Sequence, residues 1–410
     1  MNKSKKSIFI VTASVFALAL LLLFFIFVSK KSVVAFYGLN SREEKGIISA
    51  ISKIDSDGFN SKKIKYITFN PEISLETQVK KTKPAVLFST SGASLSSLLS
   101  SAKGINVEQE ISSSFSNLSS SMQGLIVSSS KKDRTVLKSI PVLSNNYEID
   151  INMKFYREQG IKSISTWSDI ENFAKKSMNS YGAGVFVDFA NNDSTLDFFG
   201  AVEEALSGRQ IYSKAIKILN EMAETKDFSG EKTLQRLLDE KCFSNTIKML
   251  SNWYKENLFT PGTFNASTED FSGFLANGKV SVAFMTLSVH RNIPRNVIEN
   301  YASIYVPSMI PSSSRKFTAP SVCLVPLKNT KITLQIVKQS LTETTQKDMA
   351  AFTGLAPVLT KCDTQDRQAD DARYWIASTN SPFSGLSKDT NLSAEQKNLL
   401  SKSLISAIRK

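Results

Sequence analysis

The chain has 410 residues, of which 41% are hydrophobic and 21% are charged. These proportions are ordinary for a folded soluble body and exclude global disorder. Compact cores rarely grow beyond about 250–300 residues, so the length predicts two lobes. The formal net charge is +13, but the lysines are dispersed along the sequence. Because they form no basic stripe with interleaved aromatic residues, we expect a basic, solvated surface and no nucleic-acid partner.

An apolar-rich run covers residues 8–28, with lysines on both flanks. As a helix it would be about 32 Å long at roughly 1.5 Å per residue, which matches the hydrocarbon thickness of a bilayer. The run is longer than the core of a typical cleavable signal, and neither an A-x-A pattern nor a nearby cysteine accompanies it. We therefore predict that residues 1–31 are an uncleaved anchor in the cytoplasmic membrane, with the body extracytoplasmic, on the periplasmic face. A cleaved signal, which would release a secreted protein, and an internal buried helix are the alternatives.

Strands and helices alternate after this run. The apolar patterns predict strands at residues 33–37, 64–69 and 85–88, and helices at residues 42–54 and 72–83. Such alternation is typical of βαβ units with a mainly parallel sheet, in which ligands collect where strands end. The polar residues that follow two of these strands are Asn40, Ser41, Ser89, Thr90 and Ser91.

The segment from residue 89 to residue 130 is rich in serine. It could be a disordered linker, but apolar residues such as Leu95, Leu98 and Leu99 recur at intervals that suit helices. We therefore expect a folded segment.

Two short apolar runs, residues 140–143 and 149–151, flank the sequence Ser144-Asn145-Asn146-Tyr147. One interpretation is a hairpin turn at the two asparagines. The other is a crossing between the two lobes. Asparagine suits either place because it tolerates unusual backbone angles and offers both donors and acceptors.

The second half of the chain continues the alternation of strands and helices. Strands are predicted at residues 185–189, 280–285, 302–306 and 322–325, and helices at residues 170–177, 196–206, 211–224 and 232–257, with further helices to the C-terminus. The loops that follow two of these strands contain Asn191, Thr286 and His290.

Four segments resemble the motifs of one family, in its order and spacing. They are IPVLSNNYEIDINMKFYREQGIKSISTWSDIENFAKK (140–176), FSGFLANGKVSVAFMT (271–286), VCLVPLKNTK (322–331) and DMAAFTGLAPVLTK (348–361). The family is that of the extracytoplasmic solute-binding proteins of bacterial ABC transporters, in particular the large sugar-binding group (family 1). The resemblance implies an α/β, two-lobed periplasmic-binding-protein fold of type II-like topology, with a ligand cleft between the lobes. It also implies a non-enzymatic function, the capture of a small polar solute, above all a sugar or oligosaccharide, for the membrane subunits of an ABC permease.

The resemblance also implies a division of the chain. Lobe 1 would comprise residues 32–142 and 280–330, and lobe 2 residues 143–279 and 331–410. The first crossing would lie at residues 141–147 and act as a hinge, which places Asn145, Asn146 and Tyr147 at the mouth of the cleft.

Two features depart from the family pattern. Sugar binders of the group commonly present tryptophan after the strand equivalent to residues 280–285, where this chain has Thr286-Leu287-Ser288. Aromatic faces cover the apolar side of a sugar ring. The aromatic residues that could take the role of the missing tryptophan are Tyr37, Tyr147, Phe189 and Phe317.

The family's lipidated cysteine is also absent from the sequence. An anchored receptor or surface interaction protein without a transport role is therefore the alternative.

Enzymatic patterns are weak by comparison. Two S-x-x-K matches, at residues 100–103 and 128–131, lack the K-T-G triplet of cell-wall peptidases. His290, the only histidine, suits a solvated or ligand-contacting loop better than a catalytic base. The acidic residues Asp188, Asp193 and Asp197 are interpreted as solvated loop residues and not as a glycosidase pair.

The cysteines Cys242, Cys323 and Cys362 are too widely spaced for a disulfide framework or a zinc ligand set, although one disulfide remains possible outside the cytoplasm. We predict no catalytic residue, no metal ligand and no cofactor. The complete set of predicted ligand contacts is Asn40, Ser41, Ser89, Thr90, Ser91, Asn145, Asn146, Tyr147, Phe189, Asn191, Thr286, His290 and Phe317.

Overall fold

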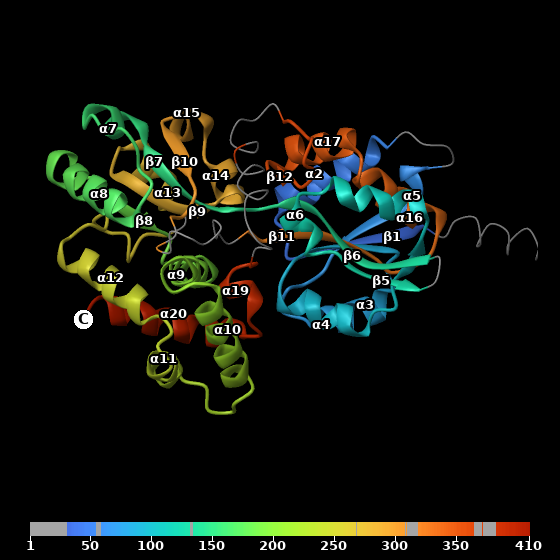
Figure 1. Ribbon diagram of the computed structural model, residues 1–410, viewed down its shortest axis with the longest axis horizontal. Coiled ribbons are helices and arrows are strands. Elements are labelled where there is room, and N and C mark those ends of the chain that lie inside the picture. Colours follow the sequence, from blue (N-terminus) through green and yellow to red (C-terminus); the bar gives the residue numbers. More distant parts are fainter. Residues whose placement is uncertain are drawn as a thin grey trace, which may run out of the picture.

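The computed structural model describes residues 31–54, 59–131, 134–267, 269–307, 309, 319–364, 371 and 383–410. The predicted anchor and Phe317 lie outside these residues. Within the described ranges, no helix combines the length and the apolar character that crossing a bilayer requires. Figure 1 shows two α/β lobes side by side, joined by the extended chain that leads from β6 to β7.

The first lobe is built on a mixed sheet. β1 (Ser32–Tyr37) pairs in parallel with β2 (Ile64–Thr68) and β3 (Val86–Thr90), as the βαβ pattern predicts. The sheet then continues through antiparallel pairs, so the mainly parallel sheet that we predicted is only its first part. The antiparallel strands are β11 (Ser321–Pro326), β6 (Arg134–Ser144) and β12 (Ala356–Pro357), with β4 (Ile105–Val107) and β5 (Val127–Lys131) added along β6.

Helices cover this sheet because its central strands are apolar on both faces, as in β1 at Val34, Ala35 and Phe36. The helices are α2 (Ser41–Ser52), α3 (Leu75–Thr82), α4 (Ala93–Ser101), α5 (Gln109–Ser113), α6 (Ser120–Gln123), α16 (Lys331–Ser340) and α17 (Glu343–Thr353), with 3-10 turns η1 (Ser61–Lys63) and η2 (Ser114–Asn117). The serine-rich segment is therefore folded, as predicted.

The second lobe has a four-stranded sheet in the order β10 (Tyr301–Ile304), β7 (Tyr147–Asn152), β9 (Val280–Thr286) and β8 (Gly184–Val187). Its core is strongly aromatic: Phe284 of β9 packs against Trp167 and Phe198, with ring centroids 6.3 and 4.9 Å away. The helices are α7 (Met153–Glu158), α8 (Trp167–Tyr181), α9 (Asn192–Ser207), α10 (Arg209–Ala223), α11 (Gly230–Asp239), α12 (Ser244–Lys255), α13 (Asp270–Ala276), α14 (Leu287–Asn292), α15 (Arg295–Ile298), α19 (Leu386–Asp389) and α20 (Ala394–Ile408).

The segment 232–257, predicted as mostly helical, is broken between α11 and α12. Lys241 and Phe243 have φ angles of 63° and 62°, a left-handed conformation that cannot continue a helix. The buried carboxylate of Glu203 accepts hydrogen bonds from the Phe243 amide at 2.8 Å and the Thr246 hydroxyl at 2.7 Å. A tertiary contact therefore stabilises the start of α12, and local periodicity carries no sign of it.

The chain changes lobe between β6 and β7. These strands pair with different sheets and not with each other, so the hairpin interpretation of residues 144–147 is wrong and the crossing is confirmed. The predicted division is wrong in two other places. β9 and β10 pair with β8 and β7 of the second lobe, whereas α17 packs on α2 of the first. Residues 280–304 therefore belong to lobe 2, and residues 331–357 belong to lobe 1.

The close packing of α17 on α2 depends on Gly46. A Cβ atom at this position would lie 2.6 Å from Thr353 Cγ2 and 2.8 Å from the Thr353 backbone nitrogen.

All three cysteines are buried free thiols, so the possible disulfide is not formed.

Candidate functional site: a polar cavity between the lobes

A cavity of about 350 Å³ lies where the two lobes meet at the crossing segment. The first lobe contributes Gly38, Asn40, Glu43 and Thr90. The second lobe contributes Asp188, Asn191, Asp193, Asp197, Thr286, Ser288 and Lys388, together with Phe271 and Phe284. Asn145, Tyr147, Pro320 and Ser321 line it from the segments that connect the lobes. The cavity therefore unites residues more than 300 positions apart in the sequence.

Six of the thirteen predicted contacts line this cavity: Asn40, Thr90, Asn145, Tyr147, Asn191 and Thr286. They come from strand ends and the crossing, where ligands of α/β sheets collect. Ser91 lines an adjoining cavity of about 260 Å³ together with Tyr37, another of the aromatic candidates.

The remaining described candidates lie elsewhere. Ser89 and Asn146 are fully buried, and Ser41 lines an outer groove at the start of α2. Phe189 faces a separate groove beside α20, where its ring stacks on Phe264 at 4.8 Å. These positions do not line the cavity between the lobes because a strand or helix end presents only some of its residues to one side.

His290 also departs from its prediction. It is 5% exposed and lies in α14, with its Nδ1 atom 3.0 Å from Asp150 and 3.1 Å from Glu148. Burial lowers the pKa of His290, but the two carboxylates outweigh this effect and raise it to about 9. We predicted a solvated or ligand-contacting loop for this residue, and the structure instead places it buried in a helix.

A hydrogen-bond network fixes the crossing to both lobes. The Asn145 amide donates to the Pro320 carbonyl at 2.7 Å, and its side-chain oxygen accepts from the Ser288 amide at 2.8 Å. The Ser288 hydroxyl in turn donates to Glu43 and accepts from the Asn40 side chain, both at 2.8 Å. Ser288 was not predicted, because a serine in a short amphipathic helix carries no sign of a partner some 245 residues away.

Tyr147 is the most informative side chain of the cavity. It is 2% exposed, and its hydroxyl has no hydrogen-bond partner in the described part of the chain. Burial, together with the nearby carboxylates of Asp197 and Asp188, raises the pKa of Tyr147 well above its ordinary value. The phenol is therefore a protonated donor, and leaving it unpaired costs about 1–3 kcal/mol. A ligand with an acceptor oxygen would satisfy it.

A group of acidic side chains, Asp188, Asp193 and Asp197, forms part of the cavity wall. The carboxylate oxygens of Asp193 lie 2.7 Å from the Nζ atom of Lys388 and 2.9 Å from the Nζ atom of Lys397. Burial alone would raise the pKa of Asp193, but the two ammonium groups lower it below its ordinary value. The adjacent Asp197 accepts from the Ser387 amide at 2.8 Å and from its hydroxyl at 3.0 Å. The wall thus presents several acceptors and one cation, Lys388, to the cavity.

Asp197 should make the stability of the protein depend on pH. Burial raises its pKa from 3.8 to about 6, although Lys388 and Ser387 oppose the change. The folded state then binds more protons than the unfolded state between these values, so the free energy of unfolding falls as the pH rises from 4 to 6. We expect this carboxyl to contribute about 3 kcal/mol over that range. Thermal unfolding of the protein and of the Asp197→Asn variant at pH 4, 5, 6 and 7 measures this contribution as the difference between the slopes of the free energy of unfolding against pH. Equal slopes for the two proteins would contradict the prediction.

The two lobes touch on both sides of the cavity. Ser91 and Ser384 place their hydroxyl oxygens 2.5 Å apart, and Arg42 donates to the Arg291 carbonyl. Gly92, at the start of α4, packs so tightly on the Lys388 backbone that a Cβ atom would collide with its carbonyl. The lobes are therefore in contact, and the cavity is partly enclosed.

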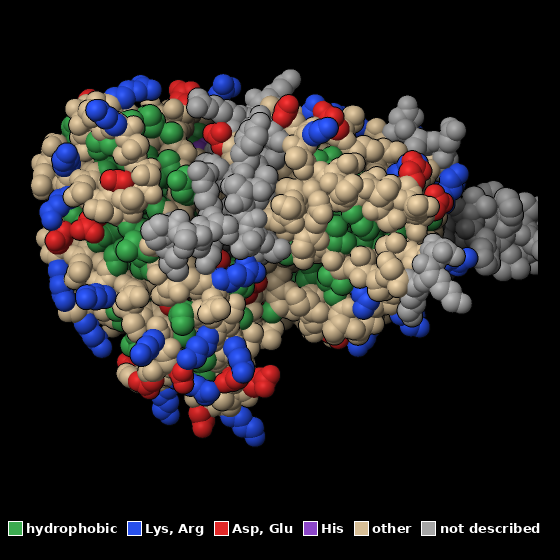
Figure 2. Space-filling view, in the orientation of Figure 1, with side chains coloured by type: hydrophobic (Ala, Val, Ile, Leu, Met, Phe, Trp, Pro, Cys, Tyr) green, Lys and Arg blue, Asp and Glu red, His purple; other side chains and the backbone are tan. Residues whose placement is uncertain are grey.

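Figure 2 shows that lysine and arginine side chains are scattered over the rim of the second lobe and mixed with acidic ones around α10 and α11. This face agrees with the dispersed basic surface predicted from the sequence.

Comparison with known proteins identifies the fold. No family model matches the sequence, and no curated protein sequence does so either. Solved structures do match, and among them are proteins described as a solute receptor and a solute-binding lipoprotein. The bacterial solute receptor AcbH, described as preferring β-D-galactopyranose exclusively, is 11% identical with a TM-score of 0.63 over 93% of this chain and 100% of its own. The binding protein MsmE of Bacillus subtilis, in an open conformation, is 13% identical with a TM-score of 0.64 over 93% and 95%. RafE of Streptococcus pneumoniae is 13% identical with a TM-score of 0.62 over 93% and 97%.

The chain therefore has the two-lobed α/β fold of bacterial solute-binding proteins. The predicted two-lobed α/β fold is confirmed for the described body, whereas the predicted membrane-spanning segment lies outside it. At these identities the likeness defines the fold and leaves the ligand to the residues of the cavity.

Proposed function

We propose that this protein is an extracytoplasmic solute-binding protein that captures a small polar solute, a sugar or short oligosaccharide, and presents it to the membrane subunits of an ABC permease. The observation that carries this proposal is the polar cavity between the two lobes, which Tyr147 lines with a buried hydroxyl that has no partner among the described residues. Solute-binding structures such as AcbH, which its description assigns to a galactopyranose, support the same function.

The chemistry of the cavity suits a ligand with many hydroxyl groups. Carboxylates and asparagine side chains accept hydrogen bonds from hydroxyls, whereas Tyr147 and Lys388 donate to ring or hydroxyl oxygens. Phe271 and Phe284 also line the cavity and give it an apolar surface, which suits the apolar side of a sugar ring. The volume of about 350 Å³ lies near the lower end of the roughly 300–1,000 Å³ of small-molecule sites. A mono- or disaccharide therefore fits better than a long chain.

The mechanism would be a shift between open and closed arrangements of the lobes. A ligand that contacts both lobes favours the closed state by its difference in affinity for the two states. The ligand contacts we propose are Asn40, Thr90, Asn145, Tyr147, Asn191 and Thr286, with Asp197 and Lys388 added from the structure. A non-enzymatic role is supported by the position of the only histidine, His290, which lies away from the cavity and against two acids.

Thermal unfolding in the presence of candidate ligands tests this proposal. The panel comprises mono- and oligosaccharides, polyols, amino acids and short peptides. A ligand at 100 times its dissociation constant should add about 2.7 kcal/mol to the free energy of unfolding, and we expect a clear rise in Tm with one class of sugar. A folded protein that responds to none of these compounds would contradict the proposal and favour a receptor or surface interaction protein on the same fold.

A further inference from the structure

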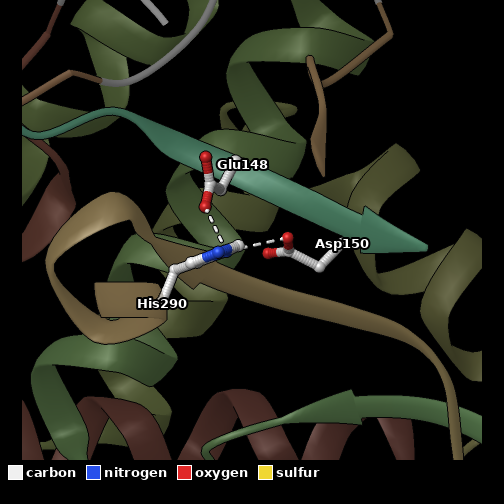
Figure 3. A group of neighbouring side chains, drawn as sticks. All are labelled: Glu148, Asp150 and His290. Carbon is white, nitrogen blue, oxygen red and sulfur yellow. Dashed lines mark hydrogen bonds and ion pairs between the residues drawn. The ribbon is translucent and has the colours of Figure 1, made fainter. Parts of the chain in front are cut away.

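Two buried carboxylates and the only histidine meet inside the second lobe. Glu148 and Asp150 lie on the same face of β7, two residues apart, and His290 faces them from α14. Glu148 and Asp150 are 0% exposed, and His290 is 5% exposed. Figure 3 shows both carboxyl groups reaching from the strand toward one edge of the imidazole. The cluster does not line the cavity between the lobes.

These side chains do not follow the apolar pattern of the strand. The alternate residues Ile149 and Ile151 belong to the hydrophobic core, as expected for a buried strand. Carboxylates in such a place are expensive unless they are paired or coordinate a metal ion. Asp150 Oδ1 accepts from the Ser303 hydroxyl at 2.8 Å and lies 3.0 Å from His290 Nδ1. Its other oxygen, Oδ2, is fully buried and has no hydrogen-bond partner among the described residues.

We propose that Glu148, Asp150 and His290 bind a divalent first-row transition metal ion, with Zn²⁺ as the representative case. One ligand atom from each residue already lies within 4.8 Å of the other two. Around a tetrahedral zinc ion, atoms bound at about 2.0–2.2 Å lie roughly 3.3–3.5 Å apart. The distances of 3.0 and 3.1 Å from His290 Nδ1 to the two carboxylates therefore need to change by only a few tenths of an ångström.

The donor set favours a transition metal over a hard cation. Imidazole suits Zn²⁺, Cu²⁺, Fe²⁺ and Ni²⁺, whereas Mg²⁺ and Ca²⁺ prefer oxygen donors alone. Three protein ligands leave a fourth position for water, as is common for zinc sites. The His290 side chain is 7% exposed whereas both carboxylates are fully buried, so an ion would enter the site past His290.

The site would connect two elements that also shape the cavity. β7 begins at Tyr147, and α14 follows Thr286 and carries Ser288, which holds the crossing and the first lobe. An ion bound between β7 and α14 would fix their relative position. The inference rests on this cluster alone and is independent of the proposed sugar-binding function.

Zn²⁺ titration of the full chain without a histidine tag tests the proposal. Because His290 is the only histidine in the sequence, its imidazole NMR signals report on this site without assignment. We expect one Zn²⁺ per chain by calorimetry and a shift of these signals that saturates at the same ratio. Asp150→Asn and Glu148→Gln, which keep the side-chain size, should each weaken binding by at least about 10–100-fold. Glu256→Gln, which alters an exposed ion pair with Lys175, is the matched control and should bind Zn²⁺ unchanged.

The competing explanation is a simple ion pair, in which a protonated His290 bridges the two carboxylates. It predicts imidazole signals that respond to pH and ignore Zn²⁺, and this result would overturn the proposal. Zn²⁺ binding that is equal in the Asp150→Asn variant and the unchanged protein would overturn it too, since the ion would then lie elsewhere. The NMR measurement on the unchanged protein decides the question even if a variant fails to fold.

Discussion

Replacing Tyr147 by phenylalanine should weaken sugar binding by about 1–3 kcal/mol, or roughly 5- to 150-fold in the dissociation constant. The variant keeps the buried ring and removes only the hydroxyl, which has no partner among the described residues. If this hydroxyl donates to the ligand, its loss removes a bond that forms only in the complex. Calorimetric titration with the sugar found in the thermal panel measures the change.

The same substitution should not destabilise the protein without ligand. Removing a buried, unpaired polar group relieves its desolvation penalty, so we expect an equal or higher Tm. Tyr212→Phe is the matched control, because Tyr212 is also fully buried with an unpaired hydroxyl but does not line the cavity. Equal affinities for the Tyr147→Phe variant, the control and the unchanged protein would show that Tyr147 is not a ligand contact.

Gly92→Ala should hold the lobes apart and weaken ligand binding by at least about tenfold, which corresponds to 1.4 kcal/mol. Gly92 has a φ angle of +132°, which is essentially restricted to glycine and costs about 1–3 kcal/mol for other residues. Its added Cβ would also collide with the Lys388 carbonyl of the other lobe. Closure of the cavity would then require displacement of α19.

Small-angle X-ray scattering measures this effect directly as a larger radius of gyration with and without ligand. Gly182→Ala separates lobe contact from backbone strain, since Gly182 has a φ angle of +61° and no atom lies within 4 Å of its added Cβ. We expect this control to lose some stability and to keep its dimensions and affinity. A Gly92→Ala variant with unchanged dimensions and affinity would contradict the role of this contact in closure.

Local patterns in the sequence predicted most of the elements of the fold. β1, α2, β2 and β3 lie within a few residues of the predicted ranges, because their apolar spacing reflects which faces are buried. The start of α2 is equally local: Asn40 accepts from the Arg42 and Glu43 amides, and Glu43 accepts from the Asn40 amide. The lobe crossing at residues 144–147 could also be predicted, from the resemblance and from the polar break between two apolar runs.

The sheet that each strand joins could not be predicted in the same way. A strand that is buried on both faces, such as β9, has the same apolar pattern in either lobe. Neither β9 nor the four-residue β10 carried a sign that it pairs beside β7. The predicted division failed at residues 280–304 for this reason.

The amino-acid sequence by itself determined the alternating strands and helices, the capped helix starts and the apolar core positions, because each depends on neighbours within a few residues. Only the tertiary structure decided where the cavity lies and which residues form the candidate metal-binding cluster. It brings Asn40 to Ser288, 248 positions away, and Asp193 to Lys388, 195 positions away. It also buries His290 between Glu148 and Asp150 instead of exposing it in a loop. Such contacts depend on how complete lobes pack, and no local spacing encodes that packing.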